Sequence, residues 1–354
     1  MSRTIESMEE LFKRVVAEDG RKHDVIADTR RMSVEANGGV KLVLDSEDVL
    51  SEFDLTDHAL GQISTDTKIP KAYFDRMKVD APGLFKTNVQ HWFQETPKNR
   101  MVRGYTNDGT DVLTGRAWMS DKFLRLDNIE IARTLLPEFD GLGTQVQFHQ
   151  AAITDTRLYI RALFPQIERD IKKVGDTVRF GVEIKNSEIG AGSLTITSFL
   201  LRLTCTNGMT ATKALNARHV GKREDAGVLS NEALAADDVA FWLAARDTLR
   251  ATCSEAAFAD ICDRLEGLSD TQVVNPVAAT KRLANEFSLT DAEQEAVMLK
   301  FAGGSLDGQW GMLNAVTAVA QTVESFDRQA DLEGIGWQIA QLPEAAWAKV
   351  AVAV

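Results

Sequence analysis

Residues 157–163 read RLYIRAL and residues 177–185 read TVRFGVEIK. Both stretches alternate polar and apolar side chains, which is the period of a half-buried β-strand. Segments of similar character run from about 144 to 153 and from about 193 to 205. The middle of the chain therefore predicts a mainly antiparallel sheet with one apolar face and one polar face.

The polar face is the main candidate for a binding surface. Three strands contribute side chains of the same parity to it, namely Gln147, His149, Arg157, Tyr159, Arg161, Arg179 and Lys185. Guanidinium groups bind phosphates, and both tyrosine and arginine offer planes on which bases stack. We expect this face to bind single-stranded nucleic acid, together with Arg218 and Lys222 from the basic segment that follows the sheet. The alternative is a polar face that is solvated, or covered by acidic helices.

Charge is distributed unevenly along the chain. The 354 residues carry a net charge of -12, yet Lys98 to Arg223 contain 19 basic and 13 acidic residues. From Glu224 to the end there are 8 basic and 21 acidic residues. A basic middle indicates either a site for an anionic ligand or a basic module that is neutralised by its acidic neighbour.

Other patterns predict elements on both sides of this sheet. An amphipathic helix should end near Gly20, and hairpins should surround Asn37-Gly38-Gly39 and Asn107-Asp108-Gly109, whose residues tolerate positive φ. After Ala226 the strand patterns stop and helical spacing takes over.

The segment from Asn186 to Ser193 is small and rich in glycine. Such a segment binds phosphate in P-loop and dinucleotide sites when a helix follows it directly. Here a predicted strand follows, so we expect the long tip of a hairpin.

These patterns predict an α+β fold, with a mainly antiparallel sheet core, packed helices and an all-helical C-terminal module. We divide the chain into a helix and hairpin region (1–97), a basic antiparallel-sheet core (98–226) and an acidic helical module (227–354).

Several classes of protein are disfavoured. No apolar stretch approaches the roughly 20 residues that cross a bilayer, and no signal peptide is recognisable, so we expect a cytoplasmic protein without membrane contact. Cys205, Cys253 and Cys262 lack metal-ligand spacing and are expected to be reduced core thiols. The five histidines form no catalytic pattern, so we expect neither an enzyme, nor a metal site, nor a cofactor.

Four groups of residues resemble a known family. They are Gly115-Arg116-Ala117 with Ser120 to Phe123 and Leu126-Asp127-Asn128; Gly181-Val182 with Asn186-Ser187 and Gly190; Arg202 to Met209; and Trp310 with Asn314 to Thr317. In this order they resemble the phage and plasmid-like DUF932 (UPF0380) family. The family pattern usually has Tyr where Phe123 stands, and the N-terminal third has no counterpart. The resemblance implies a gene of phages, prophages or plasmids, and the order of elements is similar to Rad52-like single-strand annealing proteins.

Two main hypotheses follow. In the first, the chain is a homo-oligomeric nucleic-acid-binding protein of a mobile element that binds or anneals single-stranded DNA in recombination. In the second, it is a non-enzymatic protein–protein interaction factor of a phage or plasmid, in which the basic block pairs with acidic helices. A third hypothesis is a small-anion or nucleotide binder, or a cryptic hydrolase.

Overall fold

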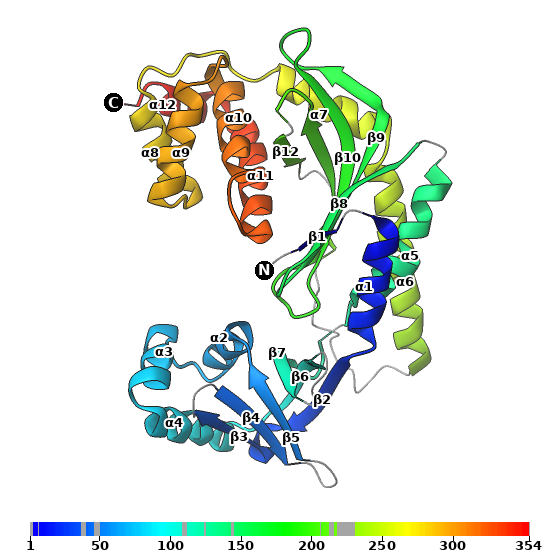
Figure 1. Cartoon of the computed structure of the whole chain (residues 1–354), viewed down its shortest axis with the longest axis vertical. Helices are drawn as coiled ribbons and strands as arrows, with labels where there is room; N and C mark the ends of the chain where they lie inside the picture. The colour runs from blue at the N-terminus through cyan, green and yellow to red at the C-terminus, as the bar shows by residue number, and fades with distance from the viewer. Residues whose placement is uncertain are drawn as a thin grey trace.

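The computed structural model describes residues 3–5, 7–36, 40–45, 50–107, 112–123, 125–142, 145–205, 207–211, 216–217 and 231–353. They form two β-sheets, each with its own helices, and Figure 1 shows the two sheets in separate lobes. The predicted α+β class is confirmed.

The N-terminal lobe is built on a six-stranded sheet. Its strands are β2 (Lys22–Asp28), β3 (Met32–Ala36), β4 (Val40–Asp45), β5 (Leu50–Leu55), β6 (Asn99–Thr106) and β7 (Leu113–Ser120). They lie in the order β2-β6-β7-β5-β4-β3, with β5 and β7 parallel and the other pairs antiparallel. Both predicted hairpins, β3–β4 and β6–β7, are confirmed.

Three helices cover one face of this sheet: α2 (Asp57–Asp66), α3 (Lys71–Asp80) and α4 (Pro82–Glu95). A short 3-10 helix, η1 (Thr29–Arg31), joins β2 to β3. The helices and the sheet enclose an apolar core, in which Phe74 and Phe85 are fully buried and meet edge to face at 4.8 Å.

The sheet of the N-terminal lobe takes in strands that the sequence placed in the basic core. Strand β6 pairs with β2 along its length, from Asn99 opposite Asp28 to Tyr105 opposite Lys22, and β7 lies parallel to β5. The line that we drew between residues 97 and 98 therefore runs through this sheet. Alternation within a strand shows which faces it has but not which distant strand it joins.

The main lobe is built on an antiparallel sheet with a short additional strand. Its strands are β1 (Arg3–Ile5), β8 (Gln147–Ile153), β9 (Leu158–Asp170), β10 (Thr177–Asn186), β11 (Leu194–Arg202), β12 (Asn207–Ala211) and β13 (Asn216–Ala217). The order is β1-β8-β9-β10-β11-β12, and β13 pairs with β11. The antiparallel sheet that period-two alternation predicted is confirmed.

In the described part of the chain, ten helical segments belong to the main lobe: α1 (Met8–Asp19), α5 (Asn128–Thr134), η2 (Leu136–Leu142), α6 (Asn231–Thr252), α7 (Glu255–Glu266), α8 (Pro276–Phe287), α9 (Asp291–Ala302), α10 (Gly308–Ala320), α11 (Phe326–Gln341) and α12 (Glu344–Ala351). Residues 231–353 contain no strand, so the predicted helical C-terminal module is confirmed. None of the described helices is both long and apolar enough to cross a membrane.

Helices lie on both faces of the main sheet. Its apolar face, which includes Ile160, Phe180 and Ile184, shares a buried core with residues of α1, α5, α6 and α7. On the other face, α10 and α11 contact β12, and Figure 1 shows them on the opposite side of the sheet from α1 and α6. The alternation is therefore as predicted, but the polar face is not open to solvent.

The cysteines are free. Cys253 and Cys262 are buried, and burial raises the pKa of each thiol to about 12, so both are inert core residues as expected. Cys205 is exposed, which corrects the expectation of a third core thiol.

Candidate nucleic-acid interface

The predicted binding face is closed at its centre. Tyr159 and Arg161 are each 1% exposed. Arg161 binds Glu183, with Nε 2.7 Å from Oε2, and also the buried Glu333 of α11. The Tyr159 hydroxyl donates to Asp327 of α11 at 2.8 Å. The acidic helix α11 therefore binds both Tyr159 and Arg161, which we expected to contact single-stranded nucleic acid. Glu183 and Glu333 already neutralise Arg161, and helix packing denies a phosphate access to it.

Two of the other cations of this face, Arg157 and Arg179, have hydrogen-bond partners within the protein. Arg157 donates from Nη2 to the carbonyl of Ala191 at 2.8 Å. Arg179 donates from Nε to Glu168 at 2.7 Å, and a quarter of its side chain remains exposed. Lys185 is half-buried on the same strand. These residues share a face, as predicted, but they do not form an open row of cations.

The remaining predicted residues are separate from one another. Gln147 is exposed at the start of β8, whereas His149 is half-buried. Burial and the charge of Arg161 lower the pKa of His149, which therefore adds no positive charge near neutral pH. Arg218 and Lys222 lie outside the described residues.

A cleft lies where the two lobes meet. One pocket of about 690 Å³ lies between the lobes and is bounded by α1, β6, β7 and the β8–β9 turn. A second pocket of about 680 Å³ extends from it onto the N-terminal lobe, along α2, β6 and β7. Asp57 and His58 line both pockets, so the two adjoin. Six cations line them against four carboxylates: Arg14, Arg21, Lys68, Lys98, Arg100 and Arg116 against Glu18, Asp57, Asp66 and Asp155. Among the lining residues that the structure describes, cations thus outnumber carboxylates in a chain whose net charge is -12.

An aromatic ring lies among the arginines of the first pocket. The guanidinium carbons of Arg21 and Arg116 lie 5.8 and 5.5 Å from the centre of the Tyr105 ring. Cation–π attraction holds planar groups in such arrangements. The half-buried ring and the guanidinium planes provide surfaces on which a nucleic-acid base can stack.

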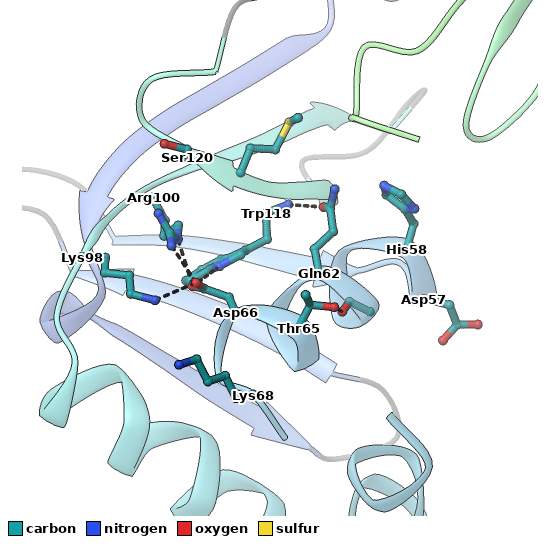
Figure 2. Close-up of a pocket in the computed structure, with 12 residues that line it drawn as sticks. Asp57, His58, Gln62, Thr65, Asp66, Lys68, Lys98, Arg100, Trp118 and Ser120 are labelled. Carbon is teal, nitrogen blue, oxygen red and sulfur yellow. Dashed lines mark hydrogen bonds and ion pairs between the residues drawn. The ribbon is translucent and has the colours of Figure 1, made fainter. Parts of the chain in front are cut away.

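Asp66 organises the cations of the second pocket (Figure 2). Its Oδ1 accepts from Lys98 Nζ at 2.8 Å and from Arg100 Nη2 at 2.6 Å, and its Oδ2 accepts from Arg100 Nε at 2.9 Å and Trp118 Nε1 at 3.0 Å. Burial alone would raise the pKa of Asp66, but these donors outweigh it and hold that pKa well below its usual range. Two cations thus share one carboxylate, while Lys68 adds a third cation to the pocket.

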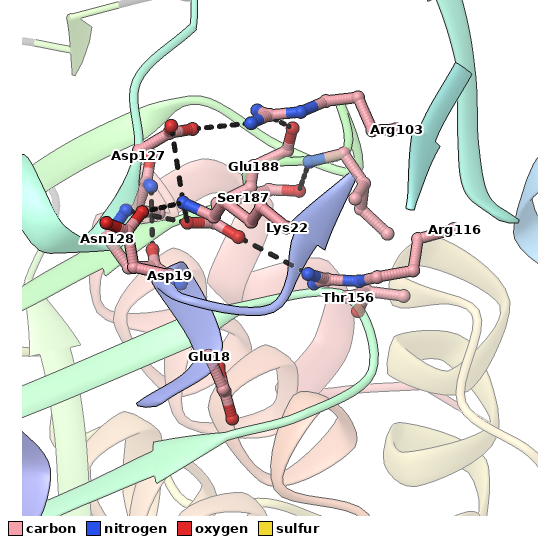
Figure 3. A network of polar contacts seen from close by, with 12 residues as sticks. Glu18, Asp19, Lys22, Arg103, Arg116, Asp127, Asn128, Thr156, Ser187 and Glu188 are labelled. Atoms are coloured by element: carbon pink, nitrogen blue, oxygen red, sulfur yellow. Dashed lines mark hydrogen bonds and ion pairs between the residues drawn. The ribbon is translucent and has the colours of Figure 1, made fainter. Parts of the chain in front are cut away.

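The buried carboxylate of Glu188 binds Arg116 between the two lobes (Figure 3). Glu188, in the loop between β10 and β11, binds Lys22 Nζ at 2.9 Å and Arg116 Nη1 at 3.3 Å. It also accepts from the backbone N–H of Asn128 at 2.8 Å. Glu188 therefore orients the Arg116 side chain, which lines the first pocket.

Arg103 of β6 makes a second set of contacts between the lobes. Together with the contacts of Glu188, we call these contacts the joint. It donates to Asp24 at 3.0 Å, to Asp127 at 2.8 Å and to the carbonyl of Glu188 at 2.9 Å. Its side chain is 4% exposed, so the three bonds are shielded from water. Side chains of both lobes are therefore bound to one another behind the cleft.

The loop from Asn186 to Ser193 connects two paired strands, as predicted, and braces the joint. The carbonyl of Ile189 accepts from Gln62 Nε2 at 2.9 Å, and His58 Nε2 lies 3.0 Å from the same oxygen. Gly190 has a φ of +75°, and a β-carbon there would come within 2.8 Å of Met119. Only glycine fits this close approach without strain.

The segments that carry the family resemblance gather in two places. Those around Arg116, Asp127 and Gly190 meet at the joint, where Asn186 Nδ2 donates to Asn128 Oδ1 at 2.9 Å. The later ones meet at α10, where Asn207 Nδ2 donates to a carbonyl of that helix at 3.4 Å. The first group thus lies directly behind the cleft.

Comparison with known proteins gave no match to a protein-family model, to a curated protein or to a solved structure.

Sequence reasoning missed the cleft because its cations come from separate elements. Arg14 is on α1, Lys68 follows α2, and Arg116 is on β7. Of these three residues, Arg116 alone belonged to a motif that the sequence analysis noted. The positive net charge of the middle block indicated an anion site but did not show which cations form it. No local spacing brings these residues together.

Proposed function

We propose that this protein binds single-stranded nucleic acid in the cleft between its lobes. The observation that carries the proposal is the excess of cations over carboxylates among the described residues that line two adjoining pockets, where the guanidinium groups of Arg21 and Arg116 lie over the Tyr105 ring. Cations neutralise the backbone, and planar groups stack on bases without reading sequence. A sequence-tolerant, salt-sensitive interaction is the expected result.

The biological setting of the proposal comes from the resemblance. It favours a mobile element and a role in single-strand annealing or recombination, and we further propose a homo-oligomer that acts in the cytoplasm. These parts are independent of the cleft and stand or fall separately.

The direct test is a binding titration of single- and double-stranded DNA and RNA at about 50 and 200 mM salt, followed by fluorescence anisotropy. Affinity should fall by orders of magnitude over this range, because each neutralised phosphate releases counterions. A triple variant, Arg14→Glu, Lys68→Glu and Lys98→Glu, should bind more weakly and show a flatter salt dependence. These side chains line the cleft and are partly or well exposed.

A matched control has the same change in net charge. Lys281, Lys300 and Lys349 are exposed on the C-terminal helices, and the triple replacement by Glu there should leave most of the affinity intact. Equal loss in both variants, or no binding by the wild type at low salt, would show the proposal to be wrong.

A second candidate function is the non-enzymatic interaction factor. An apolar pocket of about 610 Å³ between α1, η2 and β8 favours it, because Phe12 at its edge is 44% exposed. If the titration detects no nucleic-acid binding, this candidate becomes the better supported one.

A further inference from the structure

Lys68 occupies a backbone position that favours glycine. Helix α2 ends in a Schellman motif, in which the N–H of Ile69 bonds to the carbonyl of Ser64 at 3.1 Å and the N–H of Lys68 bonds to the carbonyl of Thr65 at 3.2 Å. The φ of Lys68 is +56°, in the left-handed region where a β-carbon is disfavoured. Glycine would fit without strain, so the chain carries a lysine side chain at a cost to stability.

Among the described residues, the side chain of Lys68 has no hydrogen-bond or ion-pair partner that accounts for this backbone conformation. Lys172 also has a positive φ, of +62°, but its ammonium group binds the Leu268 carbonyl and, at 2.9 Å, Asp270. Within the described part of the chain, no carboxylate pairs with Lys68, which is exposed at the rim of the second pocket. Its charge is therefore available to a ligand.

The net positive charge of this pocket matches the negative charge of a phosphate monoester. Lys68, Lys98 and Arg100 supply three positive charges, and Asp66 removes one, which leaves two. Asp57, at the other end, is paired with Lys78 outside the pocket at 3.3 Å. A phosphodiester carries one negative charge, whereas a monoester carries nearly two at neutral pH.

We propose that the pocket around Lys68, Lys98 and Arg100 binds a phosphate monoester dianion. This inference rests on the proposed function for the source of the phosphate group, which is a phosphorylated end of the nucleic-acid strand. A free mononucleotide carries the same phosphate monoester and also fits the pocket. The strand then lies with its terminal phosphate in this pocket and its following nucleotides toward Tyr105, since His58 and Asp57 line both pockets.

The experiment compares oligothymidylates of about 15 nucleotides that differ only in their ends: 5′-phosphate, 3′-phosphate or hydroxyl at both ends. One phosphorylated form should bind roughly tenfold more tightly than the hydroxyl form, which is the worth of one charged hydrogen bond. The difference should shrink as pH falls through about 6, where a monoester takes up a proton. Thymidine monophosphate and inorganic phosphate serve as competitors.

Three variants at one position test the residue itself. Lys68→Gly should abolish the end preference while its melting temperature stays equal to or above that of the wild type, because glycine relieves the left-handed backbone. Lys68→Ala should abolish the preference too, and Lys68→Arg should keep most of it. A merely structural lysine would instead leave the preference unchanged in all three.

The outcomes separate this inference from the proposed function. Strand binding with equal affinity for all three ends overturns the inference and leaves the proposed function in place. Saturable binding of thymidine monophosphate that Lys68→Gly removes, without strand binding, upholds the pocket and overturns the proposed function. An end preference that survives Lys68→Gly overturns the assignment to Lys68.

Discussion

The polar face of the main sheet and the cleft between the lobes use the same residue types with opposite results. On the sheet face, Arg161 meets Glu183 and Glu333 and is 1% exposed. In the cleft, Lys98 and Arg100 share the single carboxylate Asp66 and keep an excess of charge. Carboxylates neutralise Arg161 on the sheet face, whereas cations outnumber carboxylates among the described residues that line the cleft.

This difference shows what a count of charges along a sequence omits. The basic middle and the acidic C-terminal module suggested both an anion site and internal neutralisation, and the structure contains neutralisation at one surface and a cationic excess at another. Whether an arginine is available depends on where the opposite charge lies in three dimensions.

The largest effect should come from removing a carboxylate partner of the buried Arg161 at the sheet face. Glu333→Ala leaves Arg161 buried with one carboxylate fewer, and it also removes an acceptor of Gln321 and Gln329, which donate to Glu333 at 3.1 and 3.0 Å. We expect the free energy of unfolding to fall by about 3 to 5 kcal/mol. Urea denaturation at neutral pH measures it.

The control for this variant lies on the same helix. Asp331 is exposed, so Asp331→Ala should change the free energy of unfolding by no more than about 0.5 kcal/mol. If Glu333→Ala were as mild as Asp331→Ala, the description of Arg161 as neutralised and buried would be wrong.

A smaller effect should distinguish the two tyrosines. Tyr105→Ala removes the ring between the cleft arginines and should weaken binding of a nucleic-acid strand by about 1 to 3 kcal/mol. Tyr105→Phe keeps the ring and should therefore keep the affinity. Tyr159→Phe keeps the ring against Phe326 but loses the bond to Asp327, so it should cost about 1 kcal/mol of stability and leave affinity unchanged. Anisotropy titration and urea denaturation of each variant give the two numbers. Loss of affinity in Tyr159→Phe alone would return the binding site to the sheet.

The sequence was informative where structure depends on neighbours in the chain. The alternation of RLYIRAL gave both faces of β9, and the turn residues near Asn37 and Asn107 gave two hairpins. It failed where distant segments meet, as when β6 pairs with β2 and when α11 covers Arg161. Local periodicity fixes which side chains share a face, but it says nothing about what packs on that face.

The candidate site was harder to predict than the fold for the same reason. Lys68 was invisible as a candidate, since its distinguishing feature is a positive φ at the end of α2 that no composition or spacing reveals. Arg116 was noticed only as part of a motif, and its orientation by Glu188 depends on a loop that lies far away in the chain.

The most direct measurement of where a strand binds is photo-crosslinking. A thymidine oligonucleotide that carries 4-thiothymidine is irradiated with the wild-type protein, and the crosslinked peptides are identified by mass spectrometry. We expect crosslinks in peptides that contain Arg14, Tyr105 or Arg116, and none in the buried stretch 158–163 of β9. Crosslinks concentrated in β9, β10 and α11, with none in the cleft, would contradict binding between the lobes and indicate that α11 leaves the sheet when a strand binds.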